Sequence, residues 1–330
     1  RRKIVRGKPD LIHANSIRAG LVATAATLGL GTRVVWHLHD LLPPHPLSTC
    51  VRVFAFLCPR TRMISVSRAV AENFCGAIYG LGGGLRKRTT VILNAIELEQ
   101  FQPNPMIRQQ VRDELTHDRR FVIGIVGQLT PRKGQLELIR AFAQVLGQSQ
   151  RAVLLVAGAP LFNRDHEYER LLRDTSRQLG ISDQVLLLGA RSDVAAIMQA
   201  LDLLVVNSLA EPFGLVALEA MACGTPVVAV ACDGLTEIIE HGVDGWLVPP
   251  GDEQAMADAI VNLDRQPALR AQLAEAAKKH VASRFSADRY LAELQAFYCS
   301  GLELKPKALA TYSSARSAAE AMKVAELAEQ

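Results

Sequence analysis

The sequence has no long apolar segment, no paired cysteine motif and few aromatic residues. No stretch reaches the roughly 18 to 20 apolar residues that a membrane-spanning helix needs. The six cysteines form no CxxC pair and have no histidine at metal-ligand spacing, so a reduced, cytoplasmic compartment fits them best. Aromatic residues make up 5% of the chain. Without an aromatic stacking set, we do not expect nucleic-acid binding.

Acidic residues are scarce in the first third of the chain. The formal net charge is +4 overall, but residues 1–120 hold 18 Lys and Arg against 8 Asp and Glu. A basic surface attracts anionic lipid, nucleic acid or phosphorylated substrates, and a merely solvated basic face would show the same composition. The segment GLGGGLRKR, at 80–88, predicts a flexible, basic surface loop. Such a loop could contact an anionic membrane, or it could be a variable excursion.

Apolar, β-branched runs alternate with segments of helical periodicity, which is typical of parallel sheets covered by helices. The predicted strands are 11–14, 34–38, 63–67, 90–93, 121–127, 152–158, 184–189, 203–207, 226–230 and 245–249. The last six strands form a complete doubly wound set. The first four strands are fewer than a doubly wound domain usually has. The chain begins with Arg rather than Met. We therefore predict an α/β fold of two doubly wound, Rossmann-like lobes, with the N-terminal lobe incomplete.

The polar, proline-punctuated segment at 94–105 is typical of an interdomain linker. The sequence thus divides into a first lobe at 1–105 and a second lobe at 106–285. A helix at 286–300, capped by Ser286, crosses from one to the other. An Ala-, Ser- and Glu-rich tail at 301–330 is expected to be a loosely attached helix or disordered.

Two carboxylates lie on an otherwise apolar segment, EPFGLVALEAMACGTPVVA at 211–229. Pro212 favours a first helical turn, so we expect a helix from Pro212, with Glu211 before it and Glu219 about two turns inside. The carboxylates would then lie about 10 Å apart along the axis, close to the span of a nucleotide diphosphate sugar. Carboxylates accept hydrogen bonds from sugar hydroxyls, and the helix N-terminus suits a pyrophosphate. Taken alone, the segment is better explained as a helix whose acidic start compensates its dipole.

A second segment, GQLTPRKG at 127–134, changes that balance. It follows a predicted strand, so its turn lies at the strand's carboxyl end, where doubly wound sheets bind ligands. Arg132 and Lys133 would face the same crevice, and a charge-assisted contact to phosphate is worth about 1.5–3 kcal/mol. A basic turn alone is usually just solvated. Two phosphate-type sites in one lobe favour a functional interpretation.

The segments EPFGLVALE, GQLTPRKG, VILNAIELEQF and GTPVVAVACDGLTEIIEHGVDGWLVPPGD resemble the family 4 retaining glycosyltransferases of GT-B architecture, over about residues 9–298. The resemblance implies a hexosyltransferase that moves a hexose from a nucleotide diphosphate sugar to a glycan or lipid-linked acceptor, with retention of anomeric configuration. No DxD triplet is visible and this architecture needs no metal, so no cofactor is expected. Polysaccharide biosynthesis, in the cytoplasm or at the inner face of the cell membrane, is the implied setting.

The resemblance also assigns roles to residues of the second lobe. Glu211 would be catalytic and would bind hydroxyls of the transferred sugar, Glu219 would bind the ribose, and Lys133 would bind the diphosphate. The backbone N–H groups that would complete this site are those of Phe213, Gly214 and Leu215.

Two further positions are assigned in the same way, and one departs from the family pattern. Arg191 lies where the family's backbone contacts the base. Gln128 stands where the family has an arginine, which removes a fixed cation unless Arg132 compensates.

In the first lobe, VVWHLHD places two histidines at the end of a predicted strand. His39, followed by Asp40, matches the family's active-site histidine, which contacts the transferred sugar. His37 stands where another residue is more usual, and His13 is a weaker candidate at another strand end.

The absence of an obvious nucleophile fits a front-face mechanism, in which the leaving phosphate takes the acceptor proton. Two alternatives remain open. A nucleotide-sugar-binding protein without turnover is encouraged by Gln128. A sugar-nucleotide epimerase would release an altered sugar without an acceptor.

Overall fold

The computed structural model describes residues 1–76, 82–116, 121–160 and 166–301. Arg1–Asn94, with the described residues from Tyr290 onward, forms one compact unit, and Ala95–Arg289 forms the second. The division falls at the start of the segment predicted as a linker. Ile96 in that segment belongs to the second unit, where its N–H donates to the carbonyl oxygen of Phe285 at 3.0 Å.

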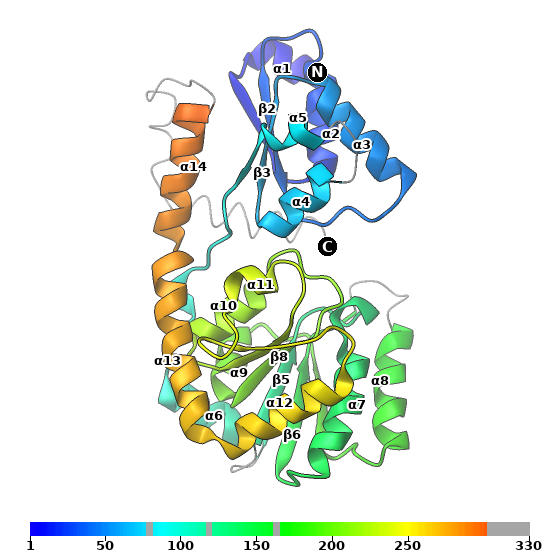
Figure 1. Ribbon diagram of the computed structural model, residues 1–330, viewed down its shortest axis with the longest axis vertical. Helices are drawn as coiled ribbons and strands as arrows, with labels where there is room; N and C mark the ends of the chain where they lie inside the picture. Colours follow the sequence, from blue (N-terminus) through cyan, green and yellow to red (C-terminus); the bar gives the residue numbers. More distant parts are fainter. Residues whose placement is uncertain (77–81, 117–120, 161–165, 302–330) are drawn as a thin grey trace. The chain divides into compact units, whose positions relative to one another are not determined.

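The first unit contains a parallel sheet with strand order β1-β2-β3-β4 (Figure 1). The strands are β1 (Leu11–Ala14), β2 (Arg33–Leu38), β3 (Thr61–Ser65) and β4 (Thr89–Val91). The helices are α1 (Arg2–Gly7), α2 (Ile17–Thr27), α3 (Pro46–Leu57), α4 (Arg68–Gly76), α5 (Gly82–Arg86) and most of α14 (Ala287–Gly301). The four strands confirm those predicted for the first lobe.

The consecutive strand order determines which way the side chains of this sheet point. Right-handed crossovers that all step in one direction place α2, α3 and α4 on one face. Trp36 points to that face: its ring meets Phe74 of α4 edge-on, with centroids 6.3 Å apart, and its indole N–H donates to Thr24 of α2 at 2.8 Å. Because side chains alternate along a strand, His37 points to the opposite face.

The expectation of a flexible loop at 80–88 is wrong where the structure describes it. Gly82–Arg86 is the helix α5, and Leu85 is completely buried. A Cβ at Gly84 would lie 2.7 Å from the ring of Phe56. The glycine here allows close packing of α5 on α3, rather than chain flexibility.

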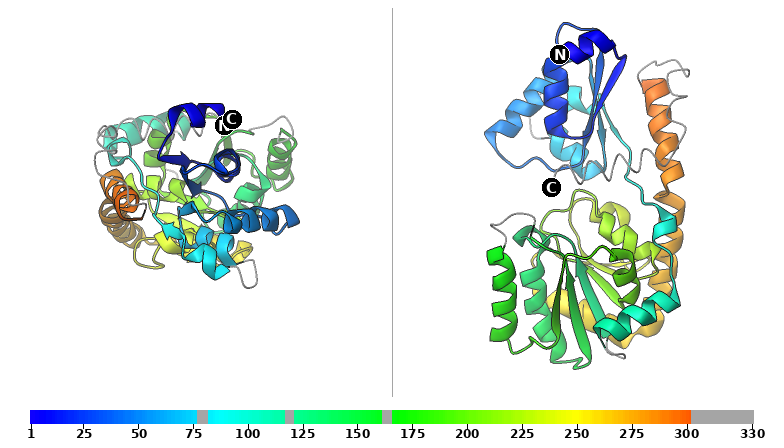
Figure 2. Two further views of the ribbon diagram at one scale, coloured as in Figure 1. Left: turned by 90° about the horizontal axis from the view of Figure 1, so that it is seen from above. Right: turned by 180° about the vertical axis from the view of Figure 1, so that it is seen from behind.

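The second unit contains a parallel sheet of order β10-β9-β8-β5-β6-β7, which confirms the predicted doubly wound set (Figures 1 and 2). The strands are β5 (Phe121–Val126), β6 (Ala152–Ala157), β7 (Val185–Gly189), β8 (Leu203–Val206), β9 (Val227–Val230) and β10 (Trp246–Val248). The order reverses between β5 and β8. Ligands of doubly wound sheets bind at this switch point, outside the carboxyl ends of the strands.

Helices cover both faces of this sheet (Figure 2). The helices of this unit are α6 (Pro105–Leu115), α7 (Gln135–Leu146), α8 (His166–Gln178), α9 (Val194–Ala200), α10 (Leu215–Ala222), α11 (Leu235–Ile238), α12 (Glu253–Arg265) and α13 (Pro267–Arg284), with the short 3₁₀ turns η1 (Leu98–Gln100) and η2 (Pro131–Lys133). The start of α14 confirms the predicted cap, because the N–H of Arg289 donates to Ser286 Oγ at 3.4 Å.

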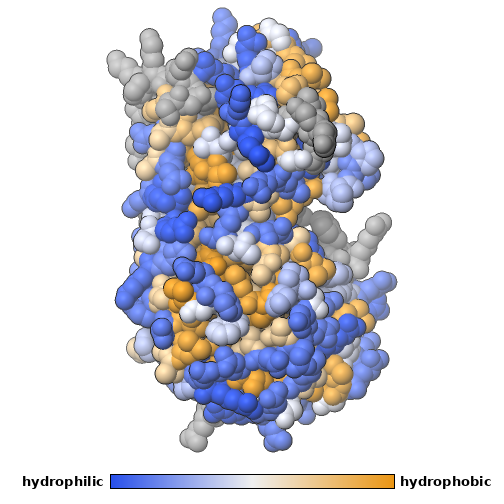
Figure 3. Space-filling model, viewed as in Figure 1, coloured by the Kyte–Doolittle hydropathy of each residue, from blue (hydrophilic) through white to orange (hydrophobic). Residues whose placement is uncertain are grey.

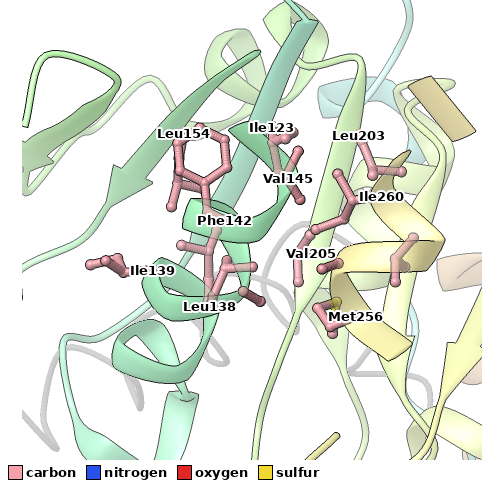
Figure 4. Packing of buried hydrophobic residues seen from close by; sticks show 14 of the residues in the cluster. Ile123, Leu138, Ile139, Phe142, Val145, Leu154, Leu203, Val205, Met256 and Ile260 are labelled. Atoms are coloured by element: carbon pink, nitrogen blue, oxygen red, sulfur yellow. The ribbon is translucent and has the colours of Figure 1, made fainter. Parts of the chain in front are cut away.

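The core of the second unit lies where α7 and α12 pack on the sheet (Figure 4). Phe142 and Leu138 of α7 meet Ile123 of β5 and Val205 of β8, and Ile260 of α12 closes the cluster. Leu138, Phe142, Ile123 and Ile260 are each 0% exposed. This apolar layer anchors the strands whose ends carry the polar residues described below.

None of the described helices is long and apolar enough to cross a membrane. The predicted tail lies outside the described residues after Gly301.

Phe142→Ala should lower the free energy of unfolding of the second unit by about 3–5 kcal/mol, because it leaves a cavity in a fully buried layer. Leu171→Ala is the matched control, since Leu171 of α8 is 46% exposed and its truncation should cost about 0.5 kcal/mol or less. Urea unfolding followed by circular dichroism measures both. Equal losses in the two variants would contradict the assignment of this core.

Candidate functional site

The loops that follow β5 and β8 are bonded to each other at the switch point of the second sheet. Asn207 donates its side-chain amide to the carbonyl of Gly134 at 2.8 Å, and the N–H of Leu209 donates to the carbonyl of Arg132, also at 2.8 Å. Gly134 has φ of +69°, and a Cβ there would lie 2.1 Å from the carbonyl oxygen of Asn207. Only glycine allows this approach.

These loops bring together two residues that the sequence singled out separately. The ammonium of Lys133 donates to Glu211 Oε2 at 2.7 Å, and the hydroxyl of Ser208 donates to the same oxygen at 2.9 Å. Glu211 is only 8% exposed. A carboxylate so buried needs charged or hydrogen-bonding partners, which Lys133 and Ser208 provide.

The backbone of Glu211 is held by a third loop, which follows the neighbouring strand β9. The N–H of Glu211 donates to Asp233 Oδ2 at 3.0 Å, and the carbonyl of Glu211 accepts from the N–H of Gly234 at 3.0 Å. Asp233 has φ of +41°, an uncommon conformation for a residue with a side chain. Asp233 and Ser208 were not predicted as site residues from the sequence. The signal was available, because ACDG directly follows a predicted strand next to the switch point.

The helix predicted to begin at Pro212 begins instead at Leu215, so this expectation was wrong. Gly214 precedes the helix with φ of +106°, which is outside helical geometry. Glu219 therefore lies one turn inside α10, about 6 Å along the axis from Leu215, rather than two turns. A Cβ at Gly214 would lie 2.7 Å from the side chain of Leu235, which explains the glycine.

The other predicted residues of this loop differ in how their side chains are used. Phe213 is 3% exposed and meets Phe285 edge-on, with centroids 6.0 Å apart, so its side chain supports the loop. Only the backbone of Phe213 could serve a ligand. The N–H of Ala217 already donates to the carbonyl of Gly214 at 3.0 Å.

The remaining predicted donor residues are spread over other loops of the second unit. Gln128 is half-buried, and its carbonyl accepts from the side chain of Gln135 at 2.8 Å; Arg132 is exposed. The guanidinium of Arg191 is occupied by Asp193, at 2.7 and 2.8 Å, and by Glu114 at 3.3 Å. The Asp193 carboxylate raises the pKa of Arg191 further above its ordinary value.

In the first unit, three histidines form a row at the carboxyl ends of β1 and β2. His13 Nε2 lies 3.3 Å from His37 Nδ1, and the rings of His37 and His39 have centroids 4.1 Å apart. The row continues at one end to the hydroxyl of Tyr298, 2.5 Å from His13 Nδ1, and at the other to Asn15 Oδ1, 2.9 Å from His39 Nε2.

Burial keeps the histidines of this row neutral at physiological pH. Desolvation lowers the pKa of His13 to about 4, and it lowers the pKa of His37 well below its ordinary value. Desolvation also lowers the pKa of His39, although the Asp40 carboxylate acts in the opposite direction. The row therefore offers hydrogen bonds rather than positive charge.

Within the described ranges, no group of three or more His, Cys, Asp or Glu side chains is arranged to hold a metal ion.

Two α/β units, each built on a parallel sheet, are the architecture of the GT-B class of glycosyltransferases. The family description "Glycosyltransferase Family 4" matches residues 1–100, and "Glycosyl transferases group 1" matches residues 107–280. The chain belongs to this glycosyltransferase family.

Curated relatives support this assignment over most of the chain. A D-inositol 3-phosphate glycosyltransferase of Stackebrandtia nassauensis is 35% identical over 292 residues, covering 84% of this chain and 65% of the relative. The enzyme of the same name from Saccharomonospora viridis is 32% identical over 300 residues, covering 85% of this chain and 67% of the relative. The chain thus spans about two thirds of the length of these relatives.

A solved structure is similar in both fold and sequence. HepE of Anabaena in complex with UDP has a TM-score of 0.83 and 32% identity, covering 91% of this chain and 81% of HepE. Its complex with UDP-glucose has a TM-score of 0.82 at the same identity and the same coverage of both chains.

The free energy of unfolding of the first unit should fall as the pH is lowered from about 6.5 toward 4. The unfolded chain protonates His13 near its ordinary pKa of about 6.5, whereas the folded chain holds that pKa near 4, so acid favours unfolding in this window. His13→Gln should flatten this part of the stability curve by up to about 3 kcal/mol. Urea unfolding at several pH values measures it, and an unchanged slope in His13→Gln would contradict the assignment.

Proposed function

We propose that this protein transfers a hexose from a uridine diphosphate sugar to a hydroxyl acceptor, with retention of anomeric configuration. The observation that carries the proposal is the buried pair of Lys133 and Glu211 at the switch point, where doubly wound sheets bind nucleotides. The complexes of HepE with UDP and UDP-glucose support a uridine donor. In this proposal residues 106–285 form the donor lobe and residues 1–105 form the acceptor-side lobe.

The donor would be held by charge at its centre and by carboxylates at its two sugars. Lys133 contacts the diphosphate and stabilises the charge that develops on it as the glycosidic bond breaks. Glu211 accepts hydrogen bonds from hydroxyls of the transferred hexose, and Glu219 accepts hydrogen bonds from hydroxyls of the ribose. The N–H groups at the start of α10 complete the diphosphate site, favoured by the helix dipole.

Lys133, the proposed ligand of the diphosphate, and Glu211, the proposed ligand of the transferred sugar, are hydrogen-bonded to each other. The ammonium of Lys133 donates a hydrogen bond to Glu211 Oε2 at 2.7 Å, so its charge is paired with this carboxylate. A bound diphosphate would take over part of this charge, while sugar hydroxyls would replace the ammonium on the carboxylate. The binding of the two halves of the donor is therefore coupled through this pair.

Retention follows in this proposal from a front-face reaction. The acceptor hydroxyl attacks the anomeric carbon on the face that the nucleoside diphosphate leaves, and the leaving phosphate takes the acceptor proton. No enzyme nucleophile and no metal take part. His39 contacts the transferred sugar as a neutral imidazole, consistent with its lowered pKa.

Lys133→Met should weaken UDP binding by about tenfold or more, because a charge-assisted contact to phosphate is worth about 1.5–3 kcal/mol. Glu219→Gln should also weaken binding if its carboxylate accepts from the ribose. Calorimetric titration with UDP, GDP and ADP measures both effects and identifies the base. Lys278→Met is the matched control, since Lys278 is also ion-paired, to Glu275 at 2.9 Å, but lies on α13.

The outcome distinguishes the proposed transferase from its alternatives. Unchanged UDP affinity in Lys133→Met would remove this lysine from the donor site. UDP-sugar binding without transfer to any acceptor would indicate a binding protein, and release of an altered UDP-sugar would indicate an epimerase. Glu211→Gln should abolish transfer while leaving a folded chain.

We further propose that the first unit docks on an anionic membrane at the cytoplasmic face, where a lipid-linked acceptor would be available. Residues 1–94 contain 14 Lys and Arg but 3 Asp and Glu. Leu47 and Leu57, at the two ends of α3, are each 68% exposed, and Arg86 and Lys87 of the adjoining α5 region are exposed. Figure 3 shows apolar and hydrophilic surface side by side on this unit, at the top of the view.

Vesicles containing phosphatidylserine should co-sediment this protein at low salt, and 0.5 M salt should release it, because cations near an anionic surface are worth about 1 kcal/mol each. The double variant Arg86→Ala, Lys87→Ala should bind several-fold less. Lys278→Ala, Lys279→Ala is the matched control on the second unit. Equal binding to neutral vesicles, or equal loss in both double variants, would contradict this docking surface.

A further inference from the structure

The histidine row of the first unit is joined by hydrogen bonds at both ends and by one ring contact, between His37 and His39. The hydroxyl of Tyr298 lies 2.5 Å from His13 Nδ1, and His13 Nε2 lies 3.3 Å from His37 Nδ1. Both nitrogens of His13 are therefore engaged. A flip of the His13 ring would break two hydrogen bonds at once, so Tyr298 and His37 together hold its orientation.

His37 transmits this restraint to His39. The ring of His37 is 2% exposed, and it lies against the ring of His39 with centroids 4.1 Å apart and an interplanar angle of 37°. The Nε2 atom of His37 has no hydrogen-bond partner among the described residues. The orientation of His37 is therefore set by its single bond to His13 and by the packing around it. A change at His13 would reach His39 through this contact.

Asn15 acts on His39 from the other side. Its side-chain oxygen lies 2.9 Å from His39 Nε2, and an amide oxygen only accepts, so Nε2 carries the proton. A neutral imidazole then keeps Nδ1 as an acceptor. The neighbouring Asp40 is the acidic group that acts on this ring, and it raises the pKa of His39 against the effect of burial.

We propose that Tyr298, His13 and His37 are positioning residues for His39, and that Asn15 selects its tautomer, leaving Nδ1 to accept from a sugar hydroxyl. The role of His39 rests on the proposed function. Tyr298 is contributed by α14, so the C-terminal helix takes part in shaping a site at the ends of β1 and β2. Neither Tyr298 nor His37 touches the substrate in this proposal.

Tyr298→Phe removes one hydroxyl and is the most direct test. We expect kcat for transfer to fall about three- to tenfold, because small displacements of a substrate-positioning group slow the reaction. KM for the UDP-sugar should change less than kcat, since the ligands proposed for the diphosphate and the ribose lie on the second unit. The pKa of His39, followed by NMR of histidine-labelled protein, should rise toward its ordinary value as the row loosens. Asn15→Asp should raise the pKa of His39 by about one unit, because a carboxylate favours the protonated ring.

Thr24→Val is the matched control within the same unit. It removes the buried hydrogen bond that Trp36 donates at 2.8 Å, on the opposite face of the sheet from His37. We expect it to lower the melting temperature without changing kcat or the pKa of His39. The comparison distinguishes a loss of stability, which both variants could show, from a loss of His39 positioning, which only Tyr298→Phe should show.

The proposal would be overturned by a wild-type kcat and an unchanged His39 pKa in Tyr298→Phe, or by the same changes in Thr24→Val. The NMR measurement needs no turnover. If the wild-type protein transfers no sugar, the proposed function fails, and the His39 pKa in Tyr298→Phe still decides whether the row positions this ring.

Discussion

The ion pair between Lys133 and Glu211 is the constraint around which the second unit is organised. A carboxylate that is 8% exposed is costly without a partner, and the ammonium must approach it from another loop. The loops after β5 and β8 are therefore bonded to each other through Gly134 and Asn207, and a third loop holds the backbone of Glu211 through Asp233. The apolar layer beneath these strands keeps their ends in register.

The two units use opposite electrostatics for their polar residues. The second unit places the buried ion pair of Lys133 and Glu211 at its switch point, and the ammonium suits a ligand with a diphosphate at its centre. The first unit places three imidazoles where burial keeps them neutral, although its overall composition is strongly basic. A neutral imidazole donates through one ring nitrogen and accepts through the other, so it can pair with sugar hydroxyls, which also do both. A glycosyltransferase needs both kinds of recognition.

Much of the fold could be predicted because hydrophobic periodicity is a local property. The ten strands of the described residues lie where the apolar runs indicated, and the capping of α14 by Ser286 was predicted from a short segment. The start of α10 was predicted wrongly at Pro212, because Gly214 has a positive φ and packs closely against Leu235, and neither feature can be read from the neighbouring residues. The expectation of a flexible loop at 80–88 was wrong for the same reason, since Gly82 and Gly84 allow close contacts with Cys75 and Phe56 of other helices.

The sequence by itself determined the α/β class, the strand positions and the residue types available for chemistry, because each depends on local pattern and composition. Only the tertiary structure decided which of these residues meet. Lys133 and Glu211 are 78 positions apart, and His13 and Tyr298 are 285 positions apart. The first pair forms because the order of parallel strands brings two distant loops together at the carboxyl ends of a sheet, and the second because α14 belongs to the same unit as β1. No single segment of the sequence specifies either arrangement.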